Sequence, residues 1–152
     1  MIWFGLAALI CGEDLFFKEY VKDYVEEDSE KPFLMDKVVL TKFFNKGAML
    51  GWLKDDQEKL KMVTLFGVGS LAGALMTYSG KRGHLLQKLG LSMMLGGAAS
   101  NAYERIRHGE VTDYIRFNMG PSKFRNIIFN KGDFAVFGGG LLWMMGECLN
   151  KD

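Results

Sequence analysis

Carboxylate, amide and basic side chains gather near the ends of the apolar segments of this chain. Asp14 and Lys18 are four residues apart, so on a helix they lie on one face. Two further groups follow later in the sequence, namely Asn101, Glu104 and Arg105, and then Asp113, Asn130 and Asp133. A single residue of this kind is usually a solvated charge at an interface. A whole set at membrane depth is costly and usually functional, so we take it as the candidate site.

Paired carboxylates are the reactive groups that such a set offers. Two carboxylates held close together cannot both ionise easily, so they share one proton. The ionised group can deprotonate a water that attacks a carbonyl carbon, while the protonated group hydrogen-bonds the carbonyl oxygen. His84 and His108 are far apart, and Cys11 and Cys148 have no CxxC spacing. We therefore expect neither a metal nor another cofactor.

Four apolar stretches must position these residues, at about 1–21, 62–80, 85–103 and 134–149. Only 62–80 is free of charge over the roughly 20 residues that a spanning helix needs. The others can span only if their charged residues lie at the headgroups or face a polar interior. Small residues in GVGSLAGA, LGGAAS and FGGGLL favour closely packed membrane helices. A soluble bundle with buried glycine-rich helices remains the alternative.

Positive charge predicts the orientation of these segments. Lys81, Arg82 and Lys88 lie in or beside the short connection between the second and third segments, which contains no acid. The positive-inside rule places this turn, and with it both termini, in the cytoplasm. Two loops, about 22–61 and 104–133, then face outward. Two runs in the first loop, KVVLTKFF and AMLGWL, could pair as a small β-layer on the membrane surface.

The composition is compatible with this layout and excludes other classes of protein. The chain has 152 residues, which suits one domain. Its 19 Lys and Arg against 18 Asp and Glu give a net charge of +1, so no global field favours nucleic acid. The apolar segment 1–12 lacks a basic start and a small-residue cleavage site, so we interpret it as a retained membrane segment.

Four short motifs carry a resemblance to one family. GGAASNAYERIRHGEVTDY, at 96–114, resembles the GGAxxNxxDRxxxGxVxDF motif of lipoprotein signal peptidases, the type II signal peptidases. FNKGD, at 129–133, resembles the FNxAD motif of that family. The run DLFFK at 14–18 is similar to its DxxxK motif, and NKGA at 45–48 to its NxGaa segment. All four occur in the family's order, and together with the four-helix layout the resemblance covers nearly the whole chain.

The resemblance implies a mainly α fold, an integral membrane bundle of four transmembrane helices with a small extracytoplasmic β-layer. It implies a single peptidase domain over 1–152, multi-pass in the bacterial cytoplasmic (inner) membrane, with its active site at the extracytoplasmic face. The implied activity is that of an aspartic endopeptidase that cleaves signal peptides from diacylglyceryl-modified prolipoproteins just before the lipidated cysteine. The expected partners are these substrates and membrane lipid, with no nucleic acid, and the protein is expected to be a monomer.

The family's catalytic aspartates fall on Asp113 and Asp133. Its substrate-binding and support residues fall on Asp14, Lys18, Asn45, Asn101, Arg105 and Asn130, and Glu104 stands where the family has Asp. Asp14 and Lys18 would fix the first helix, Asn101 and Asn130 would hold the substrate or the aspartate pair, and Arg105 could orient Glu104 or another acid.

Two departures from the family pattern lie close to these positions. Glu104 is one methylene longer than Asp, and we expect Glu104→Asp to keep or raise activity. Gly132 replaces an Ala, which would add backbone freedom beside Asp133. An aromatic and aliphatic layer of the first loop would either clamp the substrate or simply pack on the bundle; it consists of Phe43, Phe44, Leu50, Trp52 and Leu53.

Two rival interpretations remain open at this point. One is a catalytically silent relative that binds lipoprotein or lipid, which the Glu104 and Gly132 departures suggest. The other is a membrane subunit without enzyme activity, or a soluble bundle, with a coincidental motif resemblance.

Overall fold

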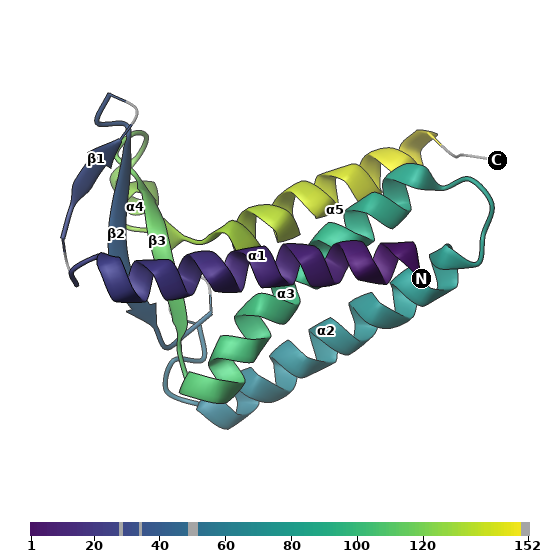
Figure 1. Cartoon of the computed structure of the whole chain (residues 1–152), viewed down its shortest axis with the longest axis horizontal. Coiled ribbons are helices and arrows are strands. Elements are labelled where there is room, and N and C mark those ends of the chain that lie inside the picture. Colours follow the sequence, from purple (N-terminus) through teal and green to yellow (C-terminus); the bar gives the residue numbers. More distant parts are fainter. Residues whose placement is uncertain (28, 34, 49–51, 150–152) are drawn as a thin grey trace.

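Four long helices lie alongside one another, and a small sheet covers one end of them (Figure 1). The computed structural model describes residues 1–27, 29–33, 35–48 and 52–149. The long helices are α1 (Ile2–Tyr24), α2 (Gln57–Ser79), α3 (Leu85–His108) and α5 (Lys131–Leu149). A short helix, α4 (Ser122–Arg125), lies in the connection between α3 and α5. Helix α3 is central, because it contacts α1, α2 and α5.

The helix boundaries follow from local capping. The side chain of Asp56 accepts a hydrogen bond from the Lys59 backbone at the start of α2. Gly109, with φ of +79°, ends α3 in the left-handed conformation that glycine adopts without strain. Each of the four apolar stretches lies within one long helix, except for residue 1, which precedes α1, and residue 80, which follows α2. Polar residues at the sheet end extend these helices.

The sheet has four antiparallel strands in the order β1 (Lys31–Phe33), β2 (Val38–Asn45), β3 (Val111–Phe117) and β4 (Ile128–Phe129). Strand β2 pairs Phe43 with Asp113 and Asn45 with Val111 of β3. The predicted strand KVVLTKFF is therefore present. The second predicted strand, AMLGWL, is wrong for its described residues, because Ala48 lies in a bend and Trp52 and Leu53 lie in a turn. Residues 49–51, including Leu50, lie outside the described residues.

Helices α3 and α5 approach so closely that only glycine fits at their contact. A Cβ atom on Gly97 would lie 2.2 Å from the Gly132 carbonyl oxygen, and one on Gly90 would lie 2.4 Å from that of Gly139. The small residues thus let two backbones touch, as the sequence predicts. This contact sets the spacing of the two helices that carry Asn101 and Asp133.

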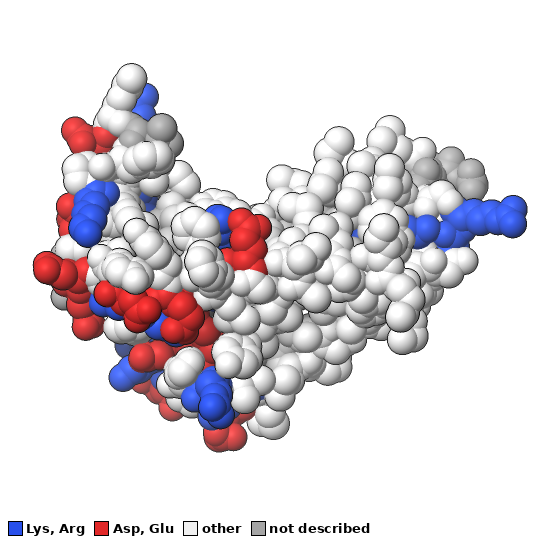
Figure 2. Space-filling model, in the orientation of Figure 1, with Lys and Arg blue, Asp and Glu red and all other residues white. Residues whose placement is uncertain are grey.

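Apolar side chains cover much of the outside of the helices. Among the described residues, α2 is the one helix that is long and apolar enough to cross a membrane, and only 11% of its most apolar stretch is buried. Large exposed side chains also project from the other long helices, among them Ile2, Leu9, Phe16, Leu85, Ile106, Phe137, Leu141 and Met144. The acidic side chains visible in Figure 2 gather around the sheet end, whereas the middle of the helices shows no charge. Contiguous exposed apolar surface of this kind marks a membrane or protein contact.

Candidate active site

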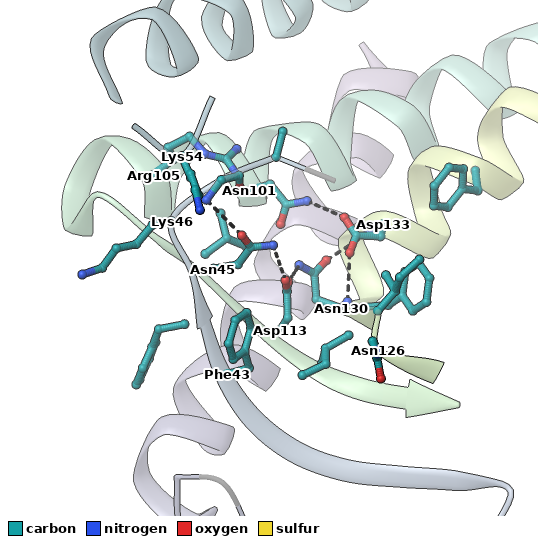
Figure 3. Close-up of a pocket in the computed structure, with 18 residues that line it drawn as sticks. Phe43, Asn45, Lys46, Lys54, Asn101, Arg105, Asp113, Asn126, Asn130 and Asp133 are labelled. Carbon is teal, nitrogen blue, oxygen red and sulfur yellow. Dashed lines mark hydrogen bonds between the residues drawn. The ribbon is translucent and has the colours of Figure 1, made fainter. Parts of the chain in front are cut away.

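A cavity of about 490 Å³ opens between the sheet and the ends of α3 and α5. Asp113 and Asp133 both line it, although they come from different elements, β3 and α5 (Figure 3). Its polar wall also contains Asn45, Asn101, Arg105 and Asn130. Its apolar wall is formed mainly by Phe43, Phe44, Val111, Ile127, Ile128, Phe129 and Phe137. The fold therefore brings six of the predicted site residues to one hollow.

Two side-chain amides hold the Asp113 carboxylate. Asn45 donates from Nδ2 to Oδ2 at 2.9 Å, and Asn130 donates from Nδ2 to Oδ1 at 2.6 Å. Asp113 is only 3% exposed. Burial, and after it the negative charge of Asp133, raise the pKa of Asp113 to about 7, although the hydrogen bonds from the two amides act in the opposite direction. A proton can therefore reside on this carboxyl group near neutral pH.

The Asp133 carboxylate is held at the first turn of α5. Asn101 donates from Nδ2 to Oδ1 at 3.0 Å, and the Asn130 backbone N–H donates to Oδ2 at 3.0 Å. In return, Asn130 Oδ1 accepts from the Asp133 backbone N–H at 2.9 Å. This reciprocal pair is a capping box, which satisfies two free N–H groups at a helix start. Asn130 lies between the two aspartates and binds both (Figure 3).

A buried ionic cluster lies behind this polar wall. Lys18 Nζ is 2.9 Å from Asp14 Oδ2 and 3.3 Å from Glu104 Oε2. It also donates to Asn101 Oδ1 at 2.7 Å, and this contact leaves the Asn101 amide nitrogen to face Asp133. All three charged side chains are at most 2% exposed, and none is among the described residues that line the cavity. The cluster thus acts on the site through Asn101.

Glu104 and Arg105 point to different partners. Arg105 lines the cavity and donates from Nη2 to the Gly47 carbonyl at 3.0 Å. In the described part of the chain, the ion pairs of Glu104 are with Lys18 and Lys22. The prediction that Arg105 orients Glu104 is therefore not supported by a direct contact. Arg105 instead ties α3 to the segment that follows β2.

Gly132 does not provide the backbone freedom expected from the sequence. A Cβ atom there would lie 2.9 Å from Asp14 Oδ2 and 3.0 Å from both Asn130 Oδ1 and the Gly97 carbonyl. This glycine lies inside α5 and is buried against α3. Its function is to allow this close contact, so that expectation is corrected.

The sequence analysis missed three residues of the cluster. Ser100 donates to Asp14 Oδ2 at 2.5 Å, and Tyr114 donates to Asp14 Oδ1 at 3.2 Å. Thr112 donates to Glu104 through both its backbone N–H and its hydroxyl. Ser100 and Tyr114 meet partners more than 80 residues away in the sequence. The one local signal that could have indicated them is their position in the sequence: Ser100 precedes Asn101, and Thr112 and Tyr114 flank Asp113.

Comparison with known proteins identifies the family. The family model for signal peptidase (SPase) II matches residues 6–149, which is most of the chain. The chain belongs to the signal peptidase II family. The resemblance carried by the four motifs is therefore confirmed.

Curated relatives and solved structures agree with this assignment. The chain is 29% identical over 144 residues to a lipoprotein signal peptidase of Xanthomonas oryzae pv. oryzae, a match that covers 93% of this chain and 85% of the relative. It is 27% identical over 152 residues to that of Francisella tularensis subsp. novicida, covering 98% and 92%. Two solved chains described as bacterial membrane enzymes share its fold. One has a TM-score of 0.80 at 22% identity and covers 99% of this chain and 94% of that one; the other has a TM-score of 0.78.

Proposed function

We propose that this protein is an aspartic endopeptidase that cleaves signal peptides from diacylglyceryl-modified prolipoproteins, just before the lipidated cysteine. The observation that carries the proposal is the meeting of Asp113 and Asp133 in one cavity of a signal peptidase II family member. Each carboxylate faces amide donors, and the negative charge of Asp133 contributes to the raised pKa of Asp113.

The proposed reaction uses one shared proton. The ionised carboxylate takes a proton from a water molecule, and the resulting hydroxide attacks the scissile carbonyl carbon. The protonated carboxyl group, for which the raised pKa of Asp113 makes that residue the candidate, donates to the carbonyl oxygen as negative charge develops. A proton then passes to the amine of the lipidated cysteine as the C–N bond breaks. The apparent pKa values of this reaction belong to the pair.

The apolar wall of the cavity suits a substrate that lies partly in lipid. The exposed Phe43 lines the cavity from β2, and Phe129 and Phe137 line it from β4 and α5. The proposed substrate is a membrane-embedded signal helix whose cut site must meet water while its lipid stays in the bilayer. Phe43 and the exposed Trp52 would cover this segment from the sheet side.

The proposed arrangement is a monomer in the bacterial inner membrane that crosses it with α1, α2, α3 and α5. The sheet and the dyad then lie at the extracytoplasmic face, and the basic turn at 80–84 lies in the cytoplasm. Single cysteines at two exposed positions, Asp55→Cys and Arg82→Cys, test this in a background without Cys11 and Cys148. An impermeant thiol reagent should label position 55 but not position 82 on intact spheroplasts; the reverse result would reject the orientation.

Purified protein in detergent, mixed with a diacylglyceryl-modified prolipoprotein, tests the activity. We expect the wild type to release the signal peptide, and Asp113→Asn and Asp133→Asn each to lose activity by at least about a thousandfold. Asp23→Asn, at an exposed carboxylate on α1, is the matched control and should cleave normally. Cleavage that persists in either dyad variant would reject the pair. A wild type that binds the substrate without cleaving it would indicate a catalytically silent relative.

A further inference from the structure

Through its carboxylate, Glu104 joins its own helix to two other elements. Its Oε2 accepts from the Thr112 backbone N–H at 2.8 Å and lies 3.3 Å from Lys18 Nζ. Its Oε1 accepts from the Thr112 hydroxyl at 2.9 Å and lies 2.7 Å from Lys22 Nζ. The carboxylate belongs to α3, both cations to α1, and Thr112 to β3. A charged group buried to this degree requires such partners, because an unpaired buried charge is strongly destabilising.

Thr112 directly precedes Asp113 on β3. Successive side chains of a strand point to opposite faces. Asp113 lines the 490 Å³ cavity, whereas Thr112 lines a separate recess of about 230 Å³ together with Lys22 and Glu104. Glu104 therefore holds the backbone of β3 from the face opposite the cavity, one residue before Asp113.

We propose that Lys22, Glu104 and Thr112 form a clamp that sets the position of the Asp113 carboxyl group against Asn45 and Asn130. All three are positioning residues, because none of them lines the cavity. The two hydrogen bonds from Thr112 to Glu104 fix the position and the rotation of β3 at Thr112 relative to α3. Lys22 in turn holds the Glu104 carboxylate in place. The inference rests on the proposed function and deepens it, since it assigns residues that place one member of the dyad.

The clamp explains the length of residue 104. An aspartate at this position would be shorter by one methylene, about 1.5 Å. It could not keep both Thr112 contacts and also reach Lys18 and Lys22 from the same backbone position. We therefore expect Glu104→Asp to lower activity, in contrast to the expectation from the family motif.

Substitutions of Thr112 separate positioning from packing. Thr112→Val keeps the shape of the side chain and loses the hydroxyl donor, and Thr112→Ser restores the donor. We expect Thr112→Val to lower kcat about tenfold with little change in KM, and Thr112→Ser to retain kcat within about twofold. Lys22→Met should lower kcat in the same direction. Thr77→Val and Lys61→Met, which remove a hydroxyl and an ion-paired lysine on α2, are matched controls and should cleave as the wild type does.

The pH–rate profile gives a readout that a packing defect would not change. The charged groups that act electrostatically on Asp113 are Asp133 of α5, Lys18 of α1 and Arg105 of α3, and Thr112→Val alters none of them. A displaced Asp113 carboxyl group should still shift the upper limb of the profile, by about half a pH unit or more. A wild-type profile and kcat in Thr112→Val would overturn the clamp, as would equal losses in Thr112→Val and Thr112→Ser.

A result that rejects the proposed function can be distinguished from one that rejects the clamp. If the wild type cleaves no prolipoprotein, the function is rejected, and the clamp is then judged on the titration of Asp113 followed by carbon-13 NMR in micelles. A shifted midpoint in Thr112→Val and a wild-type midpoint in Thr112→Ser would support the clamp. An unchanged midpoint in Thr112→Val would reject it.

Discussion

Asn130 and Asp133 hold each other at the start of α5 through two reciprocal hydrogen bonds of 2.9 and 3.0 Å. The remaining amide donor of Asn130 binds Asp113 Oδ1 at 2.6 Å. One asparagine therefore caps the helix, orients one aspartate and binds the other. Because the cap and the dyad share this side chain, the start of α5 fixes the geometry of the candidate active site.

Substitutions at Asn130 should separate its two functions. Asn130→Ser keeps an N-cap oxygen but loses the donor to Asp113, so we expect kcat to fall at least tenfold, about 1.4 kcal/mol, with stability near that of the wild type. Asn130→Ala loses the cap as well and should unfold about 1 kcal/mol more easily. Cleavage assays and thermal unfolding in detergent measure both. Normal kcat in Asn130→Ser would show that the contact to Asp113 is dispensable.

The rate of cleavage should depend on pH through the dyad. The reaction needs one proton on the pair, and the pKa of Asp113 is raised to about 7 by burial and by Asp133. We expect kcat to fall as the pH rises above about 7, because the pair then loses the one proton that the reaction needs. A pH series with a prolipoprotein substrate measures this. A rate that stays constant from pH 7 to about 9 would contradict the assignment of the proton.

Stability should depend on pH in the direction set by the same group. The ordinary pKa of an aspartate is 3.8, and the folded protein raises it to about 7. The folded state therefore holds a proton that the unfolded state has lost, and stability falls as the pH rises between these two values. Asp113→Asn has no carboxyl group to ionise, so it does not lose stability in this way as the pH rises. The melting temperature of Asp113→Asn should therefore exceed that of the wild type by more at pH 8 than at pH 4. An equal difference at both pH values would contradict the raised pKa.

Glycine contacts between α3 and α5 should tolerate no side chain. A Cβ atom on Gly97 would lie 2.2 Å from a backbone oxygen of Gly132, so Gly97→Ala must push the helices apart. We expect a loss of about 1–3 kcal/mol in stability together with reduced cleavage. Gly73→Ala on α2 is the matched control, because a Cβ atom there meets nothing within 4 Å. That substitution should be neutral or slightly stabilising, since alanine is the better helix former.

The sequence predicts the four helices, the strand at 37–44, which the structure has at 38–45, and the residues of the candidate dyad, because apolar segments and spaced motifs are local signals. It does not predict the contact of Lys22 with Glu104 or that of Tyr114 with Asp14, since these partners lie 80 or more residues away. The run AMLGWL has a strand-like composition, but β2 pairs with β1 and with β3, which follows α3 in the sequence. Strand pairing is decided by the tertiary structure, and a local pattern does not contain it. The sequence also does not predict that Glu104 and Arg105 have separate partners, because those contacts too are set by the tertiary structure.

Helix α5 fixes the distance between Asp133 and the far end of the helix bundle. Its contacts through Gly132 and Gly139 prevent it from sliding along α3, so Asp133 keeps a constant height. The helix from Asp133 to Leu149 is about 24 Å long at 1.5 Å per residue. A signal helix that enters from the cytoplasmic end must bridge a similar distance before its cut site reaches the dyad. In the proposed arrangement, the length of α5 would thus set a minimum length for the apolar part of the signal peptides that the protein can cleave.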